Sequence, residues 1–336
     1  MTASLRTFVI ANPTSGSGSV KKEWGAIERA LSNTLSEYDF AFTEGPGHAT
    51  LLAREALRAG WEMVVAVGGD GTLNEVVNGY FEKVSGEDVL SLDAQGWLSV
   101  KDAGAMVPIN PEAVVGVVPM GTGGDFRRTL GLMGGWPEAI ASLGRRDVSA
   151  IDVGMLGYTE ADGGLAVRTF INISSMGMGG LVDRLANDTW KGLGGQASYA
   201  AAVVRAFSRW DNVDVELRID DEEVLRQRLI ICILANGQYF GGGMWIAPGA
   251  TLTDGHLQLQ VLGDMTKLEA VRMAPSIYSG THVKHEKVWR RRVRQVAIRS
   301  MQGPLGELGL LDMDGEQPGQ LPALWSVMPG ALRFKR

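Results

Sequence analysis

Residues 64–77, VVAVGGDGTLNEVV, decide the fold of the chain. The first four are apolar and mostly β-branched, which predicts a strand that is covered on both faces in a parallel sheet. Thr72 and Glu75 have the spacing of a capping box, which predicts that a helix begins at Thr72. The stretch is therefore expected to run from a buried strand through a glycine turn into a helix.

The glycine turn in this stretch has the composition of a phosphate-binding site. Gly68, Gly69 and Gly71 leave backbone N–H groups accessible and permit positive φ, so a phosphate group can approach the main chain closely. Asp70 opposes a phosphate electrostatically unless it polarises a hydroxyl group or holds a metal ion, so it indicates phosphoryl transfer. The alternative is an ordinary turn in which Asp70 bonds its own backbone.

The composition favours a two-domain protein of a reducing compartment. The 336 residues are enough for two domains with a cleft between them. The 32 basic and 38 acidic residues give a net charge of −6, which offers nucleic acid no general attraction. The single cysteine, Cys232, excludes an intrachain disulfide bond, and residues 1–6 lack the apolar core of a signal peptide. We therefore expect a cytoplasmic location.

Three successive strand-and-helix units predict a doubly wound parallel sheet at the amino terminus. Residues 8–10 and 38–42 are short apolar strands, each followed by a glycine-containing loop and a helical pattern. Residues 114–118 continue the sheet and lead into a second glycine loop with an aspartate, Asp125. Ligands of such folds bind beyond the carboxyl ends of the strands, where all these loops lie. The mixed residues 84–113 predict an insertion that loops off the sheet.

The pattern changes near residue 150, where strands replace the alternation of strand and helix. We assign residues 1–149, with the insertion, to a nucleotide-binding α/β domain and residues 150–323 to a β-rich, mostly antiparallel substrate domain. For the closing strand, residues 324–336, the assignment leaves open a return to the first domain. Strands are predicted at residues 166–173, 213–219, 229–234, 256–262 and 293–299, and a helix at 196–210.

Charged residues of the second domain have alternative interpretations. Asp254 precedes a glycine, so it is either a metal ligand or part of a hairpin turn. Asp314 and Glu316 are two residues apart, so on an extended strand they project to the same side and can share one acid/base or metal-binding task. Residues 284–299 carry seven Lys or Arg and one Glu, which suits either anionic lipid headgroups or a solvated strand face.

Together these motifs resemble the diacylglycerol kinase catalytic-domain family, which includes soluble bacterial diacylglycerol kinases, related lipid kinases, and the sphingosine and ceramide kinases. The resemblance rests on residues 68–75, with 12–16 upstream and 119–127 downstream. It continues through residues 239–243, 247–255 and 314–316 in the family's order, and so covers nearly the whole chain. Gly124 stands where the family commonly has Asn.

The resemblance implies a two-domain, ATP-dependent lipid kinase, with the nucleotide on the first domain and the lipid hydroxyl in the cleft. Glu316 corresponds to the proposed proton acceptor of the bacterial enzymes, with Asp314 beside it, whereas in the sphingosine kinases that role is given to the aspartate matching Asp70. The implied ATP contacts are Asn12, Pro13, Thr14, Ser15, Gly16, Thr43, Gly68, Gly69, Asp70, Gly71, Thr72, Leu73, Asn74, Glu75 and Thr122.

The resemblance also implies Mg²⁺, with a structural site near Thr251, Asp254 and His256 that Asp152 supports. We expect the γ-phosphate of ATP to pass to a lipid hydroxyl, of diacylglycerol or a related lipid, at a membrane surface that the protein contacts only peripherally and transiently. The sequence does not decide the oligomeric state, and a homodimer is one alternative. The alternatives are an NAD kinase, which shares the glycine–aspartate loop, and a nucleotide-binding regulatory protein without catalysis.

Overall fold

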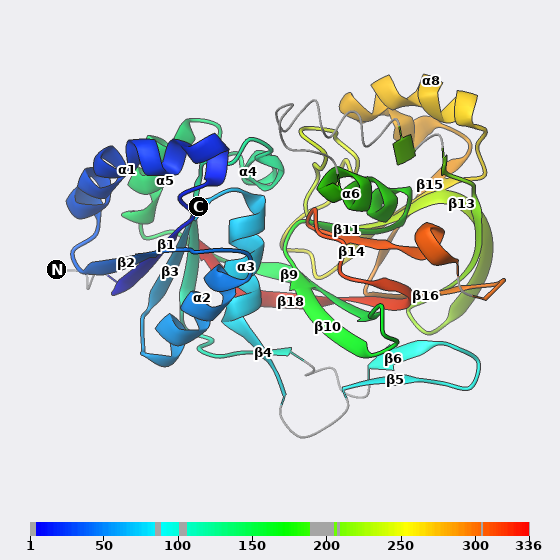
Figure 1. Cartoon of the computed structure of the whole chain (residues 1–336), viewed down its shortest axis with the longest axis horizontal. Helices are drawn as coiled ribbons and strands as arrows, with labels where there is room; N and C mark the ends of the chain where they lie inside the picture. The colour runs from blue at the N-terminus through cyan, green and yellow to red at the C-terminus, as the bar shows by residue number, and fades with distance from the viewer. Residues whose placement is uncertain are drawn as a thin grey trace.

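The computed structural model describes residues 5–84, 89–100, 106–188, 205–206, 209–303 and 305–335 (Figure 1). Figure 1 shows an α/β half, which contains the amino terminus, beside a β-rich half. The strands β9 (Val148–Thr159) and β18 (Gln320–Lys335) run between the two halves. The predicted fold class, a doubly wound parallel sheet followed by a mostly antiparallel β-rich part, is confirmed.

The α/β half is built on a parallel sheet in the order β2-β1-β3-β8. Every residue of β3 and β8 is buried, as their continuous apolar runs predict. Helices α1 and α5 pack on one face of the sheet and α2 and α3 on the other, so each face has its own core. The elements are β1 (Thr7–Ala11), α1 (Ser15–Thr34), β2 (Tyr38–Phe42), α2 (His48–Arg58), β3 (Met63–Gly68), α3 (Asp70–Tyr80), β8 (Val114–Pro119), α4 (Asp125–Leu130) and α5 (Gly135–Leu143).

The helix after β3 begins two residues earlier than predicted. α3 starts at Asp70, its N-cap residue is Gly69, and no side chain caps it. Glu75 instead accepts N–H bonds from Gly47 (2.9 Å) and Ala49 (3.0 Å) at the start of α2. The capping-box prediction was wrong because Glu75 satisfies unpaired N–H groups of the neighbouring helix rather than those of its own.

The insertion region leaves the parallel sheet, and its hairpin packs on the β-rich half. Leu90 and Leu98 of the hairpin are buried in a small core with residues of that half. The guanidinium groups of Arg218 and Arg299 lie over the Trp97 ring, 4.8 and 4.6 Å from its centroid. The described strands of the insertion region are β4 (Phe81–Lys83), which pairs with β7 (Met106–Pro108), and β5 (Leu90–Leu92), which pairs with β6 (Leu98–Val100).

The β-rich half contains antiparallel strands in the order β15-β14-β13-β12-β16-β18 around the largest core. The predicted strand 166–173 corresponds to β10 and the first residue of β11. The predicted strand 293–299 corresponds to the last residue of β15 and most of β16. Most of the predicted helix 196–210 lies outside the described residues. The remaining elements are β10 (Leu165–Phe170), β11 (Ile173–Gly177), α6 (Met178–Asp188), β12 (Val213–Ile219), β13 (Glu223–Ala235), β14 (Leu257–Gly263), α8 (Lys267–Tyr278), η2 (Thr281–Lys284), β15 (Val288–Val293), β16 (Gln295–Ser300), η3 (Gly306–Gly309) and β17 (Leu311–Met313).

The two long strands join the halves into one continuous sheet. β18 pairs antiparallel with β16 and β9 in the β-rich half, and its residues 333–335 pair in parallel with residues 114–116 of β8. The closing strand therefore reaches the first sheet. The domain boundary proposed at residue 149 falls inside β9 and stays a prediction.

Candidate active site

Three glycine loops meet at the carboxyl edge of the parallel sheet, after β1, β3 and β8. A Cβ atom added to Gly121 would lie 2.5 Å from Gly69 Cα, and one added to Gly16 would lie 2.3 Å from the Met120 carbonyl oxygen. Gly16 also has a φ of 61°, which L side chains rarely adopt. Glycine at these positions therefore permits backbone contact between loops that are far apart in the sequence.

Side-chain hydrogen bonds connect the first loop to the second. Asn12 Nδ2 donates to Thr72 Oγ1 (3.2 Å), and the Gly69 N–H donates to Ser15 Oγ (3.3 Å). Asn12 Oδ1 accepts the N–H of Thr14 (3.0 Å) and so holds the turn of the first loop. The structure thus brings residues 12–16 and 68–72 together, and their contact with ATP stays a prediction.

The other predicted nucleotide contacts lie around these loops in different settings. Thr43 is buried after β2, and its N–H donates to the Ala11 carbonyl (2.9 Å). Thr122 is exposed on the third loop, and Leu73 lines a small cavity between the second and third loops. The carboxylate of Glu75 accepts hydrogen bonds from N–H groups at the start of α2, so it is not directed at the loops.

Asp70 and Asp125 connect the loops to the β-rich half. Asp70, at the amino-terminal end of α3, accepts the Asp125 N–H (2.8 Å). Burial raises the pKa of Asp70, and the neighbouring Asp125 carboxylate acts in the same direction, against the effect of backbone N–H bonds. Asp125 in turn accepts the N–H of Gly242 (2.8 Å) and pairs with Arg128 (3.2 Å). A half-buried acid with a shifted pKa at a loop junction is a candidate functional group.

Asn74 joins α3 to the carboxyl-terminal acids. It is fully buried, and its Nδ2 donates to Asp314 Oδ2 at 2.6 Å. Asp314 also accepts the backbone N–H groups of Ile171 (2.9 Å), Asn172 (3.1 Å) and Ile173 (2.8 Å). Burial raises the pKa of Asp314 to about 6, although these four donors favour its charged form. Asp314 therefore connects its own turn to α3 and to the backbone of residues 171–173.

Asp314 and Glu316 do not project from one side of an extended strand, so that prediction was wrong. β17 ends at Met313, and Asp314 (φ 51°) and Gly315 (φ 86°) form a two-residue turn. Two backbone hydrogen bonds between Met313 and Glu316 (2.8 and 3.0 Å) close it. The physical reason is that an Asp-Gly pair readily adopts the two positive φ values of this type of hairpin turn.

Glu316 is connected to Asn74 through Arg168, a residue that the sequence did not identify. One terminal nitrogen of Arg168, Nη2, lies 2.9 Å from Glu316 Oε2 and 3.5 Å from Asn74 Oδ1. The Glu316 side chain is 39% exposed, so it remains accessible. Asn78 was also missed: it donates to Asn74 Oδ1 (3.1 Å) and to the Thr169 carbonyl (2.9 Å). Its position one helical turn after Asn74 was an available signal, whereas Arg168 lies in a strand without a motif.

The four residues predicted to hold a structural Mg²⁺ do not form an open ligand set. Asp152 accepts the N–H groups of Gly255 (2.7 Å) and Gly330 (2.8 Å), Asp254 pairs with Arg292 (2.9 Å), and the His256 Nδ1 contacts the Asp254 carbonyl (2.7 Å). Within the part of the chain that the structure describes, no three His, Cys, Asp or Glu side chains gather in a way that could hold a metal ion. Thr251 is exposed. This arrangement does not fit a resident metal ion.

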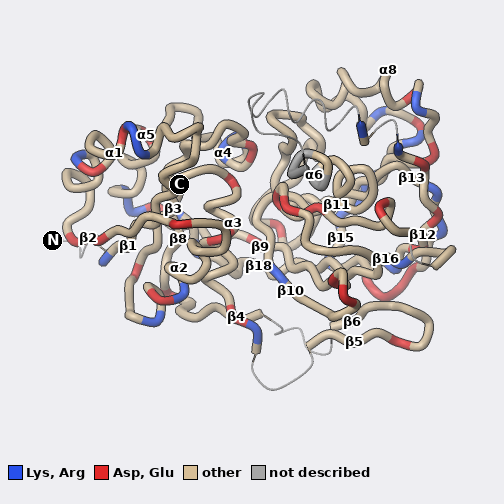
Figure 2. The backbone as a smooth tube through the Cα atoms, viewed as in Figure 1, with Lys and Arg blue, Asp and Glu red and all other residues tan. Residues whose placement is uncertain are grey.

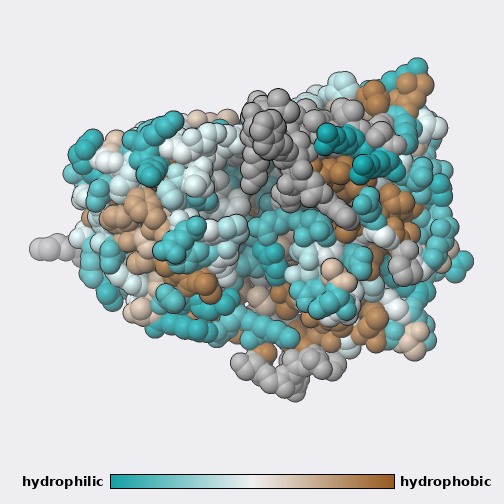
Figure 3. Space-filling model, in the orientation of Figure 1, coloured by the Kyte–Doolittle hydropathy of each residue, from teal (hydrophilic) through white to brown (hydrophobic). Residues whose placement is uncertain are grey.

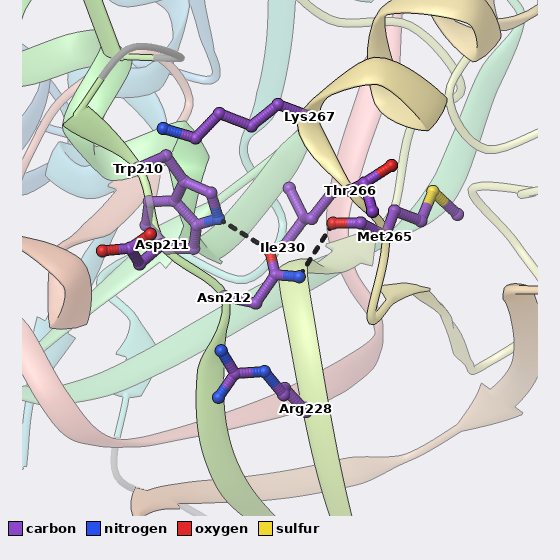
Figure 4. A pocket seen from close by; sticks show the side chains of 8 residues that line it. All are labelled: Trp210, Asp211, Asn212, Arg228, Ile230, Met265, Thr266 and Lys267. Atoms are coloured by element: carbon purple, nitrogen blue, oxygen red, sulfur yellow. Dashed lines mark hydrogen bonds between the residues drawn. The ribbon is translucent and has the colours of Figure 1, made fainter.

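A separate pocket lies in the β-rich half, away from the glycine loops (Figure 4). Trp210 Nε1 donates to Asn212 Oδ1 (3.3 Å), and Asn212 Nδ2 donates to the Met265 carbonyl (2.9 Å). Trp210 lies near Gly177 at one end of β11, and Asp314 binds the other end. The four residue steps between these ends correspond to about 13 Å, so the pocket is not part of the acid cluster.

Two parts of the chain match known domain families. Residues 6–156 match the diacylglycerol kinase catalytic domain, and residues 172–336 match the YegS C-terminal NAD kinase beta sandwich-like domain. A diacylglycerol kinase of Staphylococcus aureus (strain bovine RF122 / ET3-1) is 30% identical over 322 residues, which cover 95% of this chain and 88% of that protein. These matches define the class of protein as a two-part kinase. The chain belongs to the diacylglycerol kinase catalytic-domain family.

Solved structures share the fold along the whole chain. A crystal structure of a diacylglycerol kinase from Bacillus anthracis str. Sterne has a TM-score of 0.66 at 17% identity, with 100% of this chain and 98% of that chain covered. A yeast NADH kinase complexed with NADH has a TM-score of 0.50 at 10% identity, with 99% and 83% covered. At these identities the likeness concerns the fold alone.

Proposed function

We propose that this kinase transfers the γ-phosphate of ATP to the hydroxyl group of diacylglycerol or a related lipid. The observation that carries the proposal is the 2.6 Å hydrogen bond from Asn74 to Asp314, because it joins the glycine loops to acids that follow 240 residues later. A kinase needs a triphosphate cradle and a proton acceptor at one place, and this contact supports such a meeting. The relatives' name supports diacylglycerol as the class of acceptor.

The triphosphate is expected to bind at the amino-terminal end of α3. The N–H groups in the first turn of a helix have no partners within the helix and attract anions. Nothing lies within 4 Å of a Cβ atom added to Gly71, so the main chain is open to a ligand there. Mg²⁺ belongs to the Mg·ATP substrate in this proposal. Asp70, in the same turn, is our candidate for contact with that ion.

Glu316 suits the role of proton acceptor better than Asp314 does. Four N–H groups already occupy the two oxygens of Asp314, so this carboxylate acts as a positioning residue. Glu316 is partly exposed, and its ion pair with Arg168 involves only Oε2. Its other oxygen therefore remains open to a substrate hydroxyl.

In the proposed step the lipid hydroxyl oxygen forms a bond to the γ-phosphorus of ATP. The bond from that phosphorus to the bridging oxygen breaks, and ADP leaves with the electron pair. The hydroxyl proton passes to the free oxygen of Glu316. Asn74 and Asp314 keep the turn that carries Glu316 beside α3, so most of their effect is positioning.

Transfer of radiolabelled phosphate from Mg·ATP to diacylglycerol in detergent micelles tests the proposal. Glu316→Gln should lower kcat by about 10²-fold or more, which is the usual scale of general base catalysis, with little change in KM for ATP. Asp70→Asn should lower kcat and raise KM for Mg·ATP. Undiminished turnover in both variants would rule the assignment out. Glu112→Gln is the matched control, because it removes a surface acid that pairs with Arg333 at 2.6 Å.

The same assay separates the alternatives. NAD belongs among the acceptors because the second half matches a domain named for the NAD kinase sandwich. Phosphate transfer to NAD and to no lipid would replace the proposal. ATP binding without transfer to any acceptor would indicate a nucleotide-binding regulatory protein. A lipid acceptor would also mean that the protein works at a membrane surface, as a peripheral and transient partner.

A further inference from the structure

Helix α8 carries an exposed apolar stripe. Leu268, Val271 and Tyr278 are 58, 57 and 60% exposed, and with Pro275 they recur at spacings of three and four residues along one side of the helix. Figure 1 shows α8 at the outer edge of the β-rich half, and Figure 3 shows hydrophobic surface at that corner. In the described segments no helix has the length and apolar composition to cross a membrane, so α8 can only contact one from outside.

The opposite side of α8 is firmly attached to the protein. Ala270 and Met273 are buried in the core of the β-rich half. Thr266 and Glu269 form a capping box at the start of the helix, and Glu269 also pairs with Lys287 at 2.8 Å. The helix therefore cannot roll its apolar stripe inward, and the stripe stays exposed in the isolated molecule.

Cations border the stripe. Arg272 in α8 and Lys284 in η2 are exposed, and within the described ranges no carboxylate lies at ion-pair distance from either. Arg290, on the adjoining β15, is exposed and donates to the Pro248 carbonyl (2.9 Å). Glu286 is an exposed acid in the same segment. Figure 2 shows Lys and Arg positions around α8 with Asp and Glu positions between them, and the chain as a whole has a net charge of −6.

We propose that this surface, consisting of Leu268, Val271, Arg272, Pro275, Tyr278 and Lys284, docks on an anionic phospholipid membrane. The proposal rests on the proposed lipid-kinase function. The apolar stripe enters the boundary between headgroups and acyl chains, and the bordering cations meet lipid phosphates. A second copy of the chain is the less suitable occupant, because a two-fold contact would bring the same cations face to face. An anionic lipid surface complements both features.

The position of α8 suits delivery of a lipid to the candidate site. In Figure 1 the carboxyl-terminal end of α3 leads into β4 at the lower edge of the molecule. The amino-terminal end of α3, with Asp70, therefore points to the upper edge, where α4 and α8 also lie. A membrane that lies against α8 would thus face the side of the molecule on which the glycine loops open.

Co-sedimentation of the full chain with lipid vesicles tests the docking surface. Vesicles of phosphatidylcholine alone are compared with vesicles that also contain phosphatidylglycerol. Leu268→Gln/Val271→Gln should reduce partition onto the mixed vesicles by about tenfold, because two apolar side chains lose their burial. Arg272→Gln/Lys284→Gln should reduce partition on mixed vesicles by about tenfold and leave the weak partition on neutral vesicles unchanged.

The matched control is Leu92→Gln/Val224→Gln. Leu92 in β5 and Val224 in β13 are 50 and 52% exposed, which is close to the exposure of Leu268 and Val271. Figure 1 shows β5 at the edge opposite α8. Partition of this control should equal that of the wild type. Equal losses in control and test variants, or wild-type partition in both α8 variants, would overturn the proposal, as would a dimer that the α8 variants dissociate without loss of vesicle binding.

A second measurement separates the docking surface from the kinase assignment. Turnover of a short-chain diacylglycerol dissolved in water should be the same in wild type and α8 variants, whereas turnover of long-chain diacylglycerol in mixed vesicles should fall with partition. Absence of turnover in all proteins, with the predicted partition differences intact, would reject the lipid-kinase assignment and keep the docking surface. Equal turnover on vesicles despite reduced partition would reject the docking surface alone.

Discussion

Asn74 Nδ2 donates to Asp314 Oδ2 at 2.6 Å, in a contact from which water is excluded on the Asn74 side. Asn78 and Arg168 bond the other end of the Asn74 amide, through its Oδ1 atom. Neither Asn74 nor Asp314 can therefore rotate away without leaving a buried polar group unpaired. The contact sets the spacing between α3 and the turn that carries Glu316, so substitutions here should affect stability and catalysis together.

Asn74→Ala should lower the free energy of unfolding by about 1–3 kcal/mol, because it removes one of the four donors of the half-buried Asp314 carboxylate and one acceptor each from Asn78 and Arg168. Phosphate transfer per folded molecule should fall by about tenfold or more through loss of positioning. Urea unfolding and the labelled-phosphate assay measure these effects. Asn110→Ala, in a surface turn, is the control and should cost about 1 kcal/mol or less. Wild-type stability of Asn74→Ala would contradict the assigned role.

Acidification should lower activity through Asp314. Its pKa is raised to about 6, so the carboxyl gains a proton as the pH falls from 7 to 5 and can then accept fewer of its four N–H bonds. We expect kcat to decline with an apparent midpoint near pH 6. Asp314→Asn should have low activity without this midpoint. A wild-type profile that is flat from pH 7 to pH 5 would count against the prediction.

The same group should act on stability with the opposite sign. The folded pKa of Asp314 lies above its ordinary value of 3.8, so the folded state binds the proton more tightly than the unfolded state. The stabilisation linked to this proton is complete below pH 3.8 and is lost as the pH rises through about 6. Urea unfolding at several pH values should show this loss in the wild type and not in Asp314→Asn. Parallel curves for the two proteins would contradict it.

Gly121→Ala should weaken ATP binding. The new methyl group would meet Gly69 Cα at 2.5 Å, so the second and third loops must separate. We expect the Kd for ATP, measured by calorimetry, to rise about tenfold, since a shift of this kind costs about 1–3 kcal/mol. Gly25→Ala, in the middle of α1, is the control and should bind ATP normally with slightly raised stability. Unchanged affinity in Gly121→Ala would mean that these loops do not hold the nucleotide.

Trp97→Ala should destabilise the protein without changing its chemistry. Trp97 is buried in the hairpin of the insertion, and the guanidinium groups of Arg218 and Arg299 lie over its ring. Its loss should cost about 3 kcal/mol, the usual scale for a buried tryptophan. Turnover of a dissolved acceptor per folded molecule should stay at the wild-type value. A large fall in that turnover would instead indicate that the insertion takes part in catalysis.

The sequence was sufficient for those features that depend on local pattern. The apolar runs at β3 and β8 predict buried parallel strands, and glycine after each predicts loops that meet at one sheet edge. Asp70 was found because a carboxylate in a glycine loop is chemically unusual. These inferences need only the spacing of strands, helices and small residues along the chain.

Features that depend on distant partners could not be predicted in the same way. Glu75 has capping-box spacing but binds the start of another helix, which no local pattern reveals. Arg168 has no motif, and its role follows only from its 2.9 Å ion pair with Glu316. The Asp-Gly pair at 314–315 allowed either a strand or a turn, and the turn is stabilised by four donors from elsewhere in the chain.

The long strands β9 and β18 tie the two halves of the molecule together through backbone hydrogen bonds. Since β18 pairs with β9 along most of its length and also with β8, a cut at residue 149 would remove the outer neighbour of β8 and leave a bare apolar edge. Neither piece should therefore be soluble when produced alone. Any opening of the side that carries the glycine loops should therefore involve bending and twisting of these shared strands.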